Sequence, residues 1–510
     1  MEEFNLGKIK IGFADGEKEA NNANFENLFY TGNKKYEQIL QTHKFIISGR
    51  KGTGKTILTK YFQKMNNKDR TIVSYSKLNE ISLHEYIDIE NPNINEDVRI
   101  LFQEFYIYKQ FAMAILYNKL PFTRFFNGKI YRFKLMDYIR YLILYNNLNK
   151  IFKERYPKGV YKEEEVKTIQ KIVEASSSTA KANLGVCLEG GISGSSELSK
   201  EILLKKKNFA EQNEQLKRLI FEIVKYIDVI IMIDDLDEIR IKDVNHLIDF
   251  LICLTVKVND INAKLLEKSD KSRCILLLRS DIIEMFNNRN SNIQKILSDS
   301  NIELQWFKDT SGEEISDMIM YKIKMSSSDS TICSLGLKEI REKLFSSNSA
   351  DSFMYMLNRT FGRPRDFITY INTVIDQTPH SKKFTLQVLK ESETVYSSKF
   401  YGELRNEMSL NLSENTINEI EKLFRSLGKR NFKYHELESY YSNNIEQYKN
   451  ITDLDDMLQY LYKVGFIGTF RKVKRGNSRV YSWSYRNGGE FFNKNNMIVI
   501  HQGLLKALNL

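Results

Sequence analysis

The segment from Gly49 to Thr56 has the sequence GRKGTGKT, which matches the spacing G-x-x-x-x-G-K-[ST]. Glycines let such a segment curl until several backbone N–H groups point at one anion. Lys55 can reach the β- and γ-phosphates of a nucleotide, and the Thr56 hydroxyl is a ligand for Mg²⁺. We therefore predict that this segment binds ATP or ADP together with Mg²⁺. The predicted nucleotide contacts are Gly49, Arg50, Lys51, Gly52, Thr53, Gly54, Lys55, Thr56 and Ile57.

A phosphate-binding loop needs a strand before it and a helix after it. The apolar run from Lys44 to Ser48 is typical of a strand, and Ile57, Leu58 and Tyr61 have helical spacing. The helix would direct the positive end of its dipole at the same phosphates. The alternative is a glycine-rich turn that contains a lysine by chance, and the flanking elements argue against it.

Two adjacent acids follow the most continuous apolar run of the chain, Val229 to Ile233. A strand apolar on both faces belongs in the middle of a parallel sheet. An acid at its carboxyl end would face bound phosphates across the switch point of the sheet. We predict that Asp234 is the acid on the Mg²⁺ side and that Asp235 orients or deprotonates the attacking water. The alternative is that these acids, with Asp237 and Glu238, cap a helix.

Arg279 follows another apolar run, Cys274 to Leu278. If this strand lies beside the acid-bearing strand, Arg279 would lie near the γ-phosphate and stabilise charge that develops there. The alternative is that Arg279 pairs locally with Asp281. The sequence leaves both open.

Further segments make the pattern more specific: Phe29 to Gly32 before the loop, Ile302 to Trp306 as a last strand, and GRPRD from Gly362 to Asp366. With GRKGTGKT, IDDLD and LLLRSD, these segments resemble bacterial P-loop ATPases allied to the KAP and STAND branches of the AAA+-like group. More narrowly, the chain resembles the FunZ-type P-loop ATPase family. The resemblance runs from about residue 25 to the end and is weakest between about 86 and 210.

The resemblance implies an α/β fold, a P-loop NTPase of the ASCE type, with a parallel sheet of order 5-1-4-3-2 followed by a helical lid. In such lids a G-x-P-R segment presents an arginine to the nucleotide, here Arg365. Pro364 suits the first position of a helix. Many relatives use glutamate as the water-activating acid where this chain has Asp235. The rate of ATP hydrolysis is therefore left open, and both a slow switch and a fast motor fit the sequence. The resemblance also implies a homo-oligomer, a partner effector protein, and a setting in bacterial antiviral defence or a DNA-associated process.

About 150 residues separate the predicted strand Arg70 to Ser74 from the strand at Val229, far more than one crossover needs. We interpret this interval as an inserted α-helical subdomain, with a loop rich in serine and glycine from Ala175 to Ser199. The predicted domains are a lead segment 1–35, an ATPase core 36–80 and 216–308, the insertion 81–215, a helical lid 309–400 and a winged-helix-like domain 401–510.

The winged-helix prediction rests on three helical patterns followed by two strand-like runs, Phe466 to Phe470 and Val480 to Ser484. The turn between the runs is basic over residues 471–479 and could neutralise DNA phosphates. The alternative is a protein-docking module whose hairpin tip is merely solvated. His501, a lone histidine near the end, is interpreted as structural.

Composition excludes several classes of protein. Charged residues make up 28% of the 510 residues, and the net charge of +11 is modest for this length. The four cysteines, Cys187, Cys253, Cys274 and Cys333, have no C-x-x-C spacing, which fits a reducing cytoplasm rather than a disulfide framework. No apolar run approaches the roughly 18 residues of a membrane helix, and no signal peptide is recognisable. We therefore expect a cytoplasmic protein without membrane segments.

The sequence thus favours an ATP-binding and hydrolysing switch or motor. One alternative is a nucleotide-gated scaffold that binds DNA or protein and turns over little. A small-molecule kinase is disfavoured, because the chain is long and lacks an arginine-bearing lid motif for an acceptor.

Overall fold

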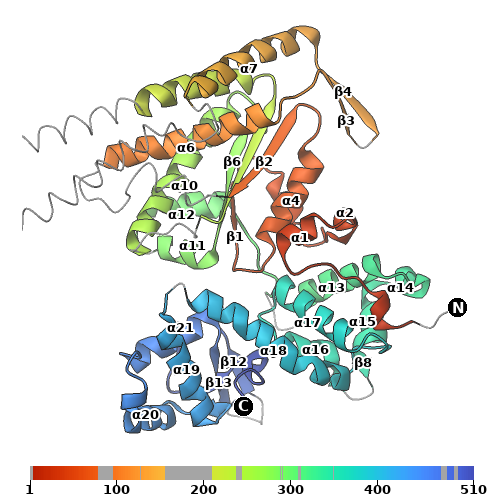
Figure 1. Ribbon diagram of the computed structural model, residues 1–510, viewed down its shortest axis with the longest axis vertical. Helices are drawn as coiled ribbons and strands as arrows, with labels where there is room; N and C mark the ends of the chain where they lie inside the picture. Colours follow the sequence, from red (N-terminus) through yellow and green to blue (C-terminus); the bar gives the residue numbers. More distant parts are fainter. Residues whose placement is uncertain are drawn as a thin grey trace, which may run out of the picture. The chain divides into compact units, whose positions relative to one another are not determined.

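The computed structural model describes residues 4–77, 96–126, 128–155, 209–236, 244–287, 289, 291–307, 312–347, 350–409, 411–472, 479–486 and 492–510. The chain divides into two compact units, coloured by sequence in Figure 1. Unit 1 contains residues 1–33, 52–54 and 305–510, and unit 2 contains residues 34–51 and 55–304. The loop predicted over 175–199 and the acids Asp237 and Glu238 lie outside the described residues.

Unit 2 is built on a parallel five-stranded sheet of order β2-β5-β6-β1-β7. Its strands are β1 (Ile46–Ser48), β2 (Thr71–Lys77), β5 (Asp228–Asp234), β6 (Arg273–Leu278) and β7 (Asn301–Glu303). If the strands are numbered in chain order and counted from β7, the order is 5-1-4-3-2. All residues of β1 and β6 are buried, as continuous apolar runs in a parallel sheet require.

Helices cover this sheet. They are α3 (Lys35–Ile39), α4 (Lys55–Asn66), α6 (Glu96–Tyr117), α7 (Leu135–Arg155), α10 (Val244–Leu266), α11 (Ser280–Asn287), α12 (Ser291–Ser300) and a helix over 209–223. In Figure 1, α6 lies between the sheet and α7, and α6 contacts β5, β2, α7 and α10. The described part of the insertion therefore packs onto the sheet rather than standing apart from it.

The sequence predicts an α-helical insertion, but the described part of the insertion also contains two strands. An antiparallel hairpin, β3 (Thr123–Phe126) with β4 (Lys129–Arg132), joins α6 to α7. Gly128 has a φ of 73°, a left-handed conformation that glycine adopts without steric cost. The aromatic run before this glycine favours a strand, and the prediction gave too little weight to that signal.

Unit 1 contains a helical part. It consists of η1 (Leu6–Lys8), α1 (Gly16–Ala20), α2 (Phe25–Leu28), α13 (Glu313–Ser326), α14 (Ser330–Ser334), α15 (Leu337–Phe345), α16 (Ser352–Leu357), α17 (Pro364–Gln377) and α18 (Leu386–Met408), with a short pair of strands β8 (Ser346–Ser347) and β9 (Ala350–Asp351). A buried ion pair of 2.5 Å between Glu19 and Lys322 ties α1 to α13. The lead segment thus packs as part of this helical layer.

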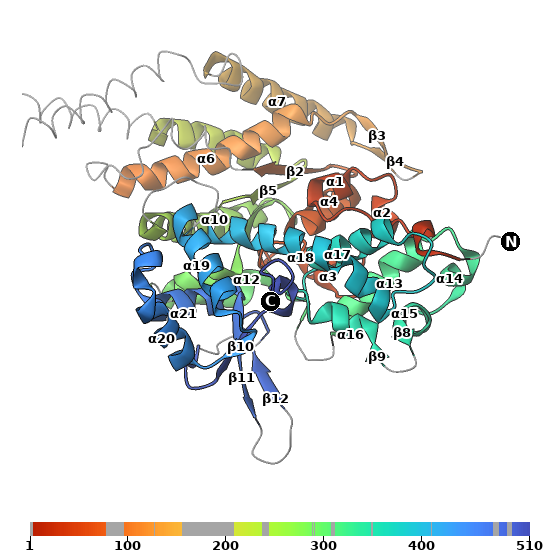
Figure 2. The same ribbon diagram turned by 60° about the horizontal axis from the view of Figure 1, so that its bottom comes forward.

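The rest of unit 1 contains α19 (Glu414–Leu427), α20 (Tyr434–Asn443), η2 (Ile445–Gln447), α21 (Leu454–Val464) and η3 (Gln502–Leu504) around a sheet of order β10-β13-β11-β12. The strands are β10 (Asn431–Phe432), β11 (Ile467–Lys472), β12 (Arg479–Ser482) and β13 (Met497–Ile500). Figure 2 shows β11 and β12 projecting away from the three α-helices. The basic residues Lys474 and Arg475 of the predicted turn lie outside the described residues.

The two parts of unit 1 share one core. α18 contacts both η3 and α21, and the Ser397 hydroxyl donates to the Gly503 carbonyl at 2.7 Å. His501 is fully buried: Gly503 N–H donates to its Nδ1 at 3.1 Å, and Tyr485 Oη lies 3.0 Å from its Nε2. Burial first, then the charge of Arg486, lowers the pKa of His501 well below its usual value.

Within the parts of the chain that the structure describes, no helix combines the length and the apolar content needed to cross a lipid bilayer.

Candidate nucleotide site

The predicted phosphate loop joins β1, which ends at Ser48, to α4, which begins at Lys55. Gly52 and Gly54 have φ values of 85° and 98°, so two positions of the loop need the conformational freedom of glycine. Residues 52–54 are grouped with unit 1, where Arg365 N–H donates to the Gly52 carbonyl at 3.4 Å. α4 is a helix of 12 residues, and the positive end of its dipole lies at the loop, where it favours an anion.

Lys55 lies across the loop. Its Nζ donates to the carbonyl oxygen of Gly49 at 2.8 Å, so the side chain of the first residue of α4 reaches back to the start of the loop. This places a point charge beside the N–H groups at the start of α4. A cation in that position is suited to the outer phosphates of a nucleotide.

The two predicted metal ligands lie together. The Thr56 hydroxyl donates to Asp234 Oδ2 at 2.9 Å, although the residues are 178 positions apart in sequence. Asp234 is the last residue of β5 and is only 4% exposed. The parallel sheet produces this proximity, because the carboxyl ends of its strands lie at one edge.

A residue that the sequence analysis missed completes this group. Tyr75 of β2 donates its hydroxyl to the same Asp234 Oδ2 at 2.7 Å. Burial, followed by the charge of Asp234, raises the pKa of Tyr75, so the phenol stays protonated and is the donor. The sequence predicts a strand that ends at Ser74, whereas β2 continues to Lys77.

Asp235, the predicted water-activating residue, follows directly. Its φ of 57° is left-handed, which is uncommon outside glycine, although aspartate tolerates it better than most residues. Its N–H donates to Asp234 Oδ1 at 2.9 Å, and its Oδ2 lies 3.0 Å from Lys77 Nζ. Backbone strain of this kind is often found at functional sites.

Arg279 makes the local pair that the sequence had left open. Its Nε donates to Asp281 Oδ1 at 3.0 Å and its Nη2 to Asp281 Oδ2 at 2.7 Å. The pair lies at the junction between β6 and α11. Two parallel hydrogen bonds hold the guanidinium in a fixed orientation.

Arg365 belongs to unit 1, whereas Lys55, Asp234, Asp235 and Arg279 belong to unit 2. Pro364 occupies the start of α17, as its fixed φ favours, and Arg365 follows in the first turn. Arg365 Nη1 lies 3.1 Å from Glu403 Oε2 of α18.

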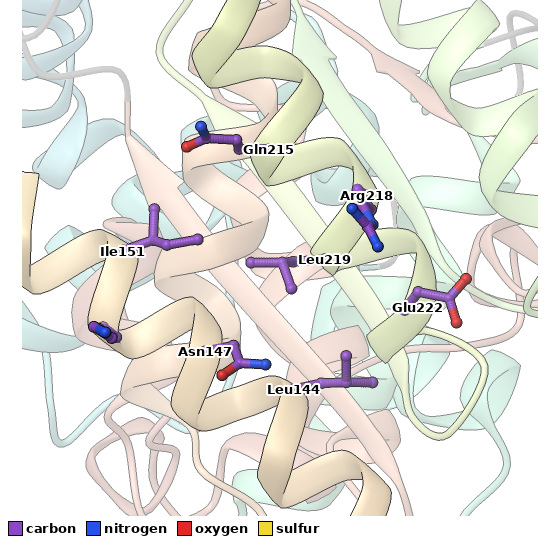
Figure 3. Close-up of a pocket in the computed structure, with 8 residues that line it drawn as sticks. Leu144, Asn147, Ile151, Gln215, Arg218, Leu219 and Glu222 are labelled. Carbon is purple, nitrogen blue, oxygen red and sulfur yellow. The ribbon is translucent and has the colours of Figure 1, made fainter.

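A separate pocket of about 680 Å³ lies between α7 and the helix over 209–223 (Figure 3). Its lining residues are Leu144, Asn147, Lys150, Ile151, Gln215, Arg218, Leu219 and Glu222. In Figure 3, Leu219 lies between the two helices with Asn147 opposite it. None of the predicted nucleotide or metal contacts lines this pocket, so it is distinct from the loop.

Comparisons with known proteins give a partial family match. Residues 313–405 match the FunZ-associated C-terminal helical domain. No curated protein matches the chain. Among solved structures, the chain is similar to Cdc6p from Pyrobaculum aerophilum (12% identity, 94% of this chain and 93% of that chain, TM-score 0.30) and to Drosophila ORC bound to DNA (10% identity, 99% and 91%, TM-score 0.24). TM-scores this far below 0.5 say nothing about function. The evidence for the function of this chain is the geometry of the site.

Proposed function

We propose that the chain is a Mg²⁺-dependent ATPase that acts as a nucleotide-driven switch or motor. The observation that carries this proposal is the hydrogen bond between Thr56 and Asp234 beside Lys55. It unites a loop hydroxyl with a strand-end carboxylate, and these are the groups that hold Mg²⁺ beside the phosphates in P-loop NTPases.

The donor set fits a magnesium nucleotide. Thr56 and Asp234 offer oxygen atoms, which Mg²⁺ prefers, and a bound nucleotide and water would supply its remaining ligands. Among the described residues, no group of three or more histidine, cysteine, aspartate or glutamate side chains could hold a metal ion. Bound Mg²⁺ neutralises charge on the β- and γ-oxygens.

The chain's own residues perform the other steps. The loop N–H groups and Lys55 bind the phosphates, and Asp235 orients the attacking water or accepts its proton. Asp235 is paired with Lys77, so nucleotide binding has to free the carboxylate for this role. Arg279, Arg365 or an arginine of a neighbouring subunit reports loss of the γ-phosphate, and the first two must exchange their present carboxylate partners to do so.

The carboxyl-terminal part is proposed as a winged-helix domain. Three helices with an antiparallel sheet support this, as do the exposed cations Arg471, Lys472 and Arg479 on β11 and β12. DNA is the partner that these cations favour, and a protein effector is the alternative. A cytoplasmic homo-oligomer in bacterial antiviral defence, or in a DNA-associated process, is the setting that the FunZ-type resemblance suggests.

The test compares three variants. Lys55→Ala should weaken ATP affinity by about 10- to 100-fold, because a charge-assisted contact is lost, as measured by calorimetry with Mg²⁺. Asp235→Ala should retain ATP binding and lose about 10²- to 10⁴-fold in phosphate release, because a group acting on water is removed. Asp270→Ala, at an exposed acid of unit 2, is the matched control and should change neither.

Each outcome separates the alternatives. If the wild-type protein takes up neither ATP nor ADP, the proposed function is wrong. If ATP binds and Asp235→Ala leaves phosphate release unchanged, the chain is a nucleotide-gated scaffold.

A further inference from the structure

Among the residues that the structure describes, three donate hydrogen bonds to Asp234. Its Oδ1 accepts from the Asp235 N–H, while its Oδ2 accepts from the hydroxyls of Thr56 and Tyr75. Because Asp234 is buried, water cannot readily replace a lost donor. The orientation of this carboxylate is therefore set by its neighbours, and Tyr75 makes the shortest of the three contacts.

Tyr75 is itself held in place from two sides. β2 pairs with β5 in parallel register, with Tyr75 opposite Met232 and Lys77 opposite Asp234. The ammonium of Lys60, from α4, lies 3.8 Å from the centre of the Tyr75 ring. A cation at this distance attracts the ring face, so strand and helix together fix where the phenol points.

We propose that Tyr75 is a positioning residue for the metal site. The Tyr75 hydroxyl keeps Asp234 Oδ2 turned toward Thr56, so that Asp234 Oδ2 and the Thr56 hydroxyl oxygen can bind the same Mg²⁺. This inference rests on the proposed function and adds to it a residue outside both nucleotide motifs. A hydroxyl donor behind a metal-binding carboxylate fixes the orientation of that ligand, and losing such a partner typically weakens metal affinity 10- to 100-fold.

The chemistry also explains why a phenol suits this position. Thr56 must direct a lone pair toward the metal while its hydroxyl proton is donated to Asp234. With only Thr56 as partner, Oδ2 could rotate away whenever that hydroxyl turned. A protonated phenol on a rigid ring cannot compete as a metal ligand, yet it holds the carboxylate throughout.

The experiment uses the full chain with ADP and Mn²⁺, a paramagnetic substitute for Mg²⁺. Free Mn²⁺ is quantified by electron paramagnetic resonance during titration of the protein–ADP complex, and ADP affinity is measured separately in EDTA. Tyr75→Phe should weaken Mn²⁺ binding about tenfold and leave the metal-free ADP affinity unchanged. The matched control is Tyr36→Phe, which removes a phenol that accepts a 3.1 Å bond from Asn66 in the same unit.

The remaining outcomes overturn the proposal. Equal Mn²⁺ affinity in Tyr75→Phe and wild type would show that the hydroxyl does not position the carboxylate. If Tyr75→Phe lowers the metal-free ADP affinity as much as it lowers the Mn²⁺ affinity, Tyr75 stabilises the fold of the phosphate loop instead. If wild-type protein binds no ADP, the proposed function fails first, and that result is recognisable before any variant is made.

Discussion

The buried ion cluster around Arg363 provides the most quantitative prediction. Arg363 precedes α17, and its side chain is 4% exposed. Its Nη1 lies 2.7 Å from Glu407 Oε1 of α18, and its Nε lies 3.1 Å from Asp366 Oδ2. Arg363→Met keeps a side chain of similar length but leaves two carboxylates buried without their cation. Breaking such a buried pair costs about 3–5 kcal/mol of the free energy of unfolding.

The chain offers a matched control two residues away. Arg365 pairs with Glu403 at 3.1 Å, but these side chains are 24% and 44% exposed. Surface pairs contribute at most about 1 kcal/mol, so Arg365→Met should be mild. The double variant Arg363→Met/Glu407→Met also removes one of the two buried carboxylates that lose their cation in Arg363→Met. It should be less destabilised than the sum of its single variants, because the two residues are in contact.

The assay is urea unfolding followed by tryptophan fluorescence. The chain has only two tryptophans, Trp306 and Trp483, and both belong to unit 1. Their emission therefore follows the unit that contains the cluster, and linear extrapolation yields its free energy of unfolding. If Arg363→Met costs no more than Arg365→Met, the cluster does not stabilise the junction of α17 with α18, and our reasoning about burial is wrong.

Two further predictions concern the carboxyl-terminal part. Because the pKa of buried His501 is lowered, the unfolded chain binds a proton near pH 6.5 that the folded chain does not. Stability of unit 1 should therefore fall below that pH by up to about 1.4 kcal/mol per pH unit, and urea unfolding of His501→Gln should show a flatter pH profile. Replacing Arg471, Lys472 and Arg479 by Gln should reduce the logarithmic salt slope of duplex DNA binding, measured by fluorescence anisotropy, by about 3. An unchanged slope would assign the hairpin to another partner.

The interior strands of unit 2 could be predicted because burial on both faces demands continuous apolar residues. β1, β5 and β6 begin or end within two residues of the predicted runs. The proximity of Thr56 and Asp234 also follows from sequence, since carboxyl ends of parallel strands share one edge. The helix start at Pro364 follows from the chemistry of proline.

The edge strand was harder to predict. β2 is buried over Thr71–Val73 but progressively exposed toward Lys77, so its last residues lack the continuous apolar run of the interior strands. Their strand conformation comes from pairing with β5, a partner that local sequence does not reveal. Tyr75 and Lys77 were missed for that reason. The choice of Asp281 as the partner of Arg279 likewise depends on side-chain geometry that spacing alone leaves undetermined.

The register of β2 with β5 also has a consequence for synthesis. Thr71 pairs with Asp228 across a long stretch of chain, and closing so large a loop is entropically costly and slow. On the ribosome the phosphate loop emerges well before its acidic counterpart. A nascent chain truncated before Asp234 would carry the glycines and Lys55 but no carboxylate for Thr56. Competence to hold magnesium should therefore arise abruptly near the middle of translation, once β5 inserts between β2 and β6.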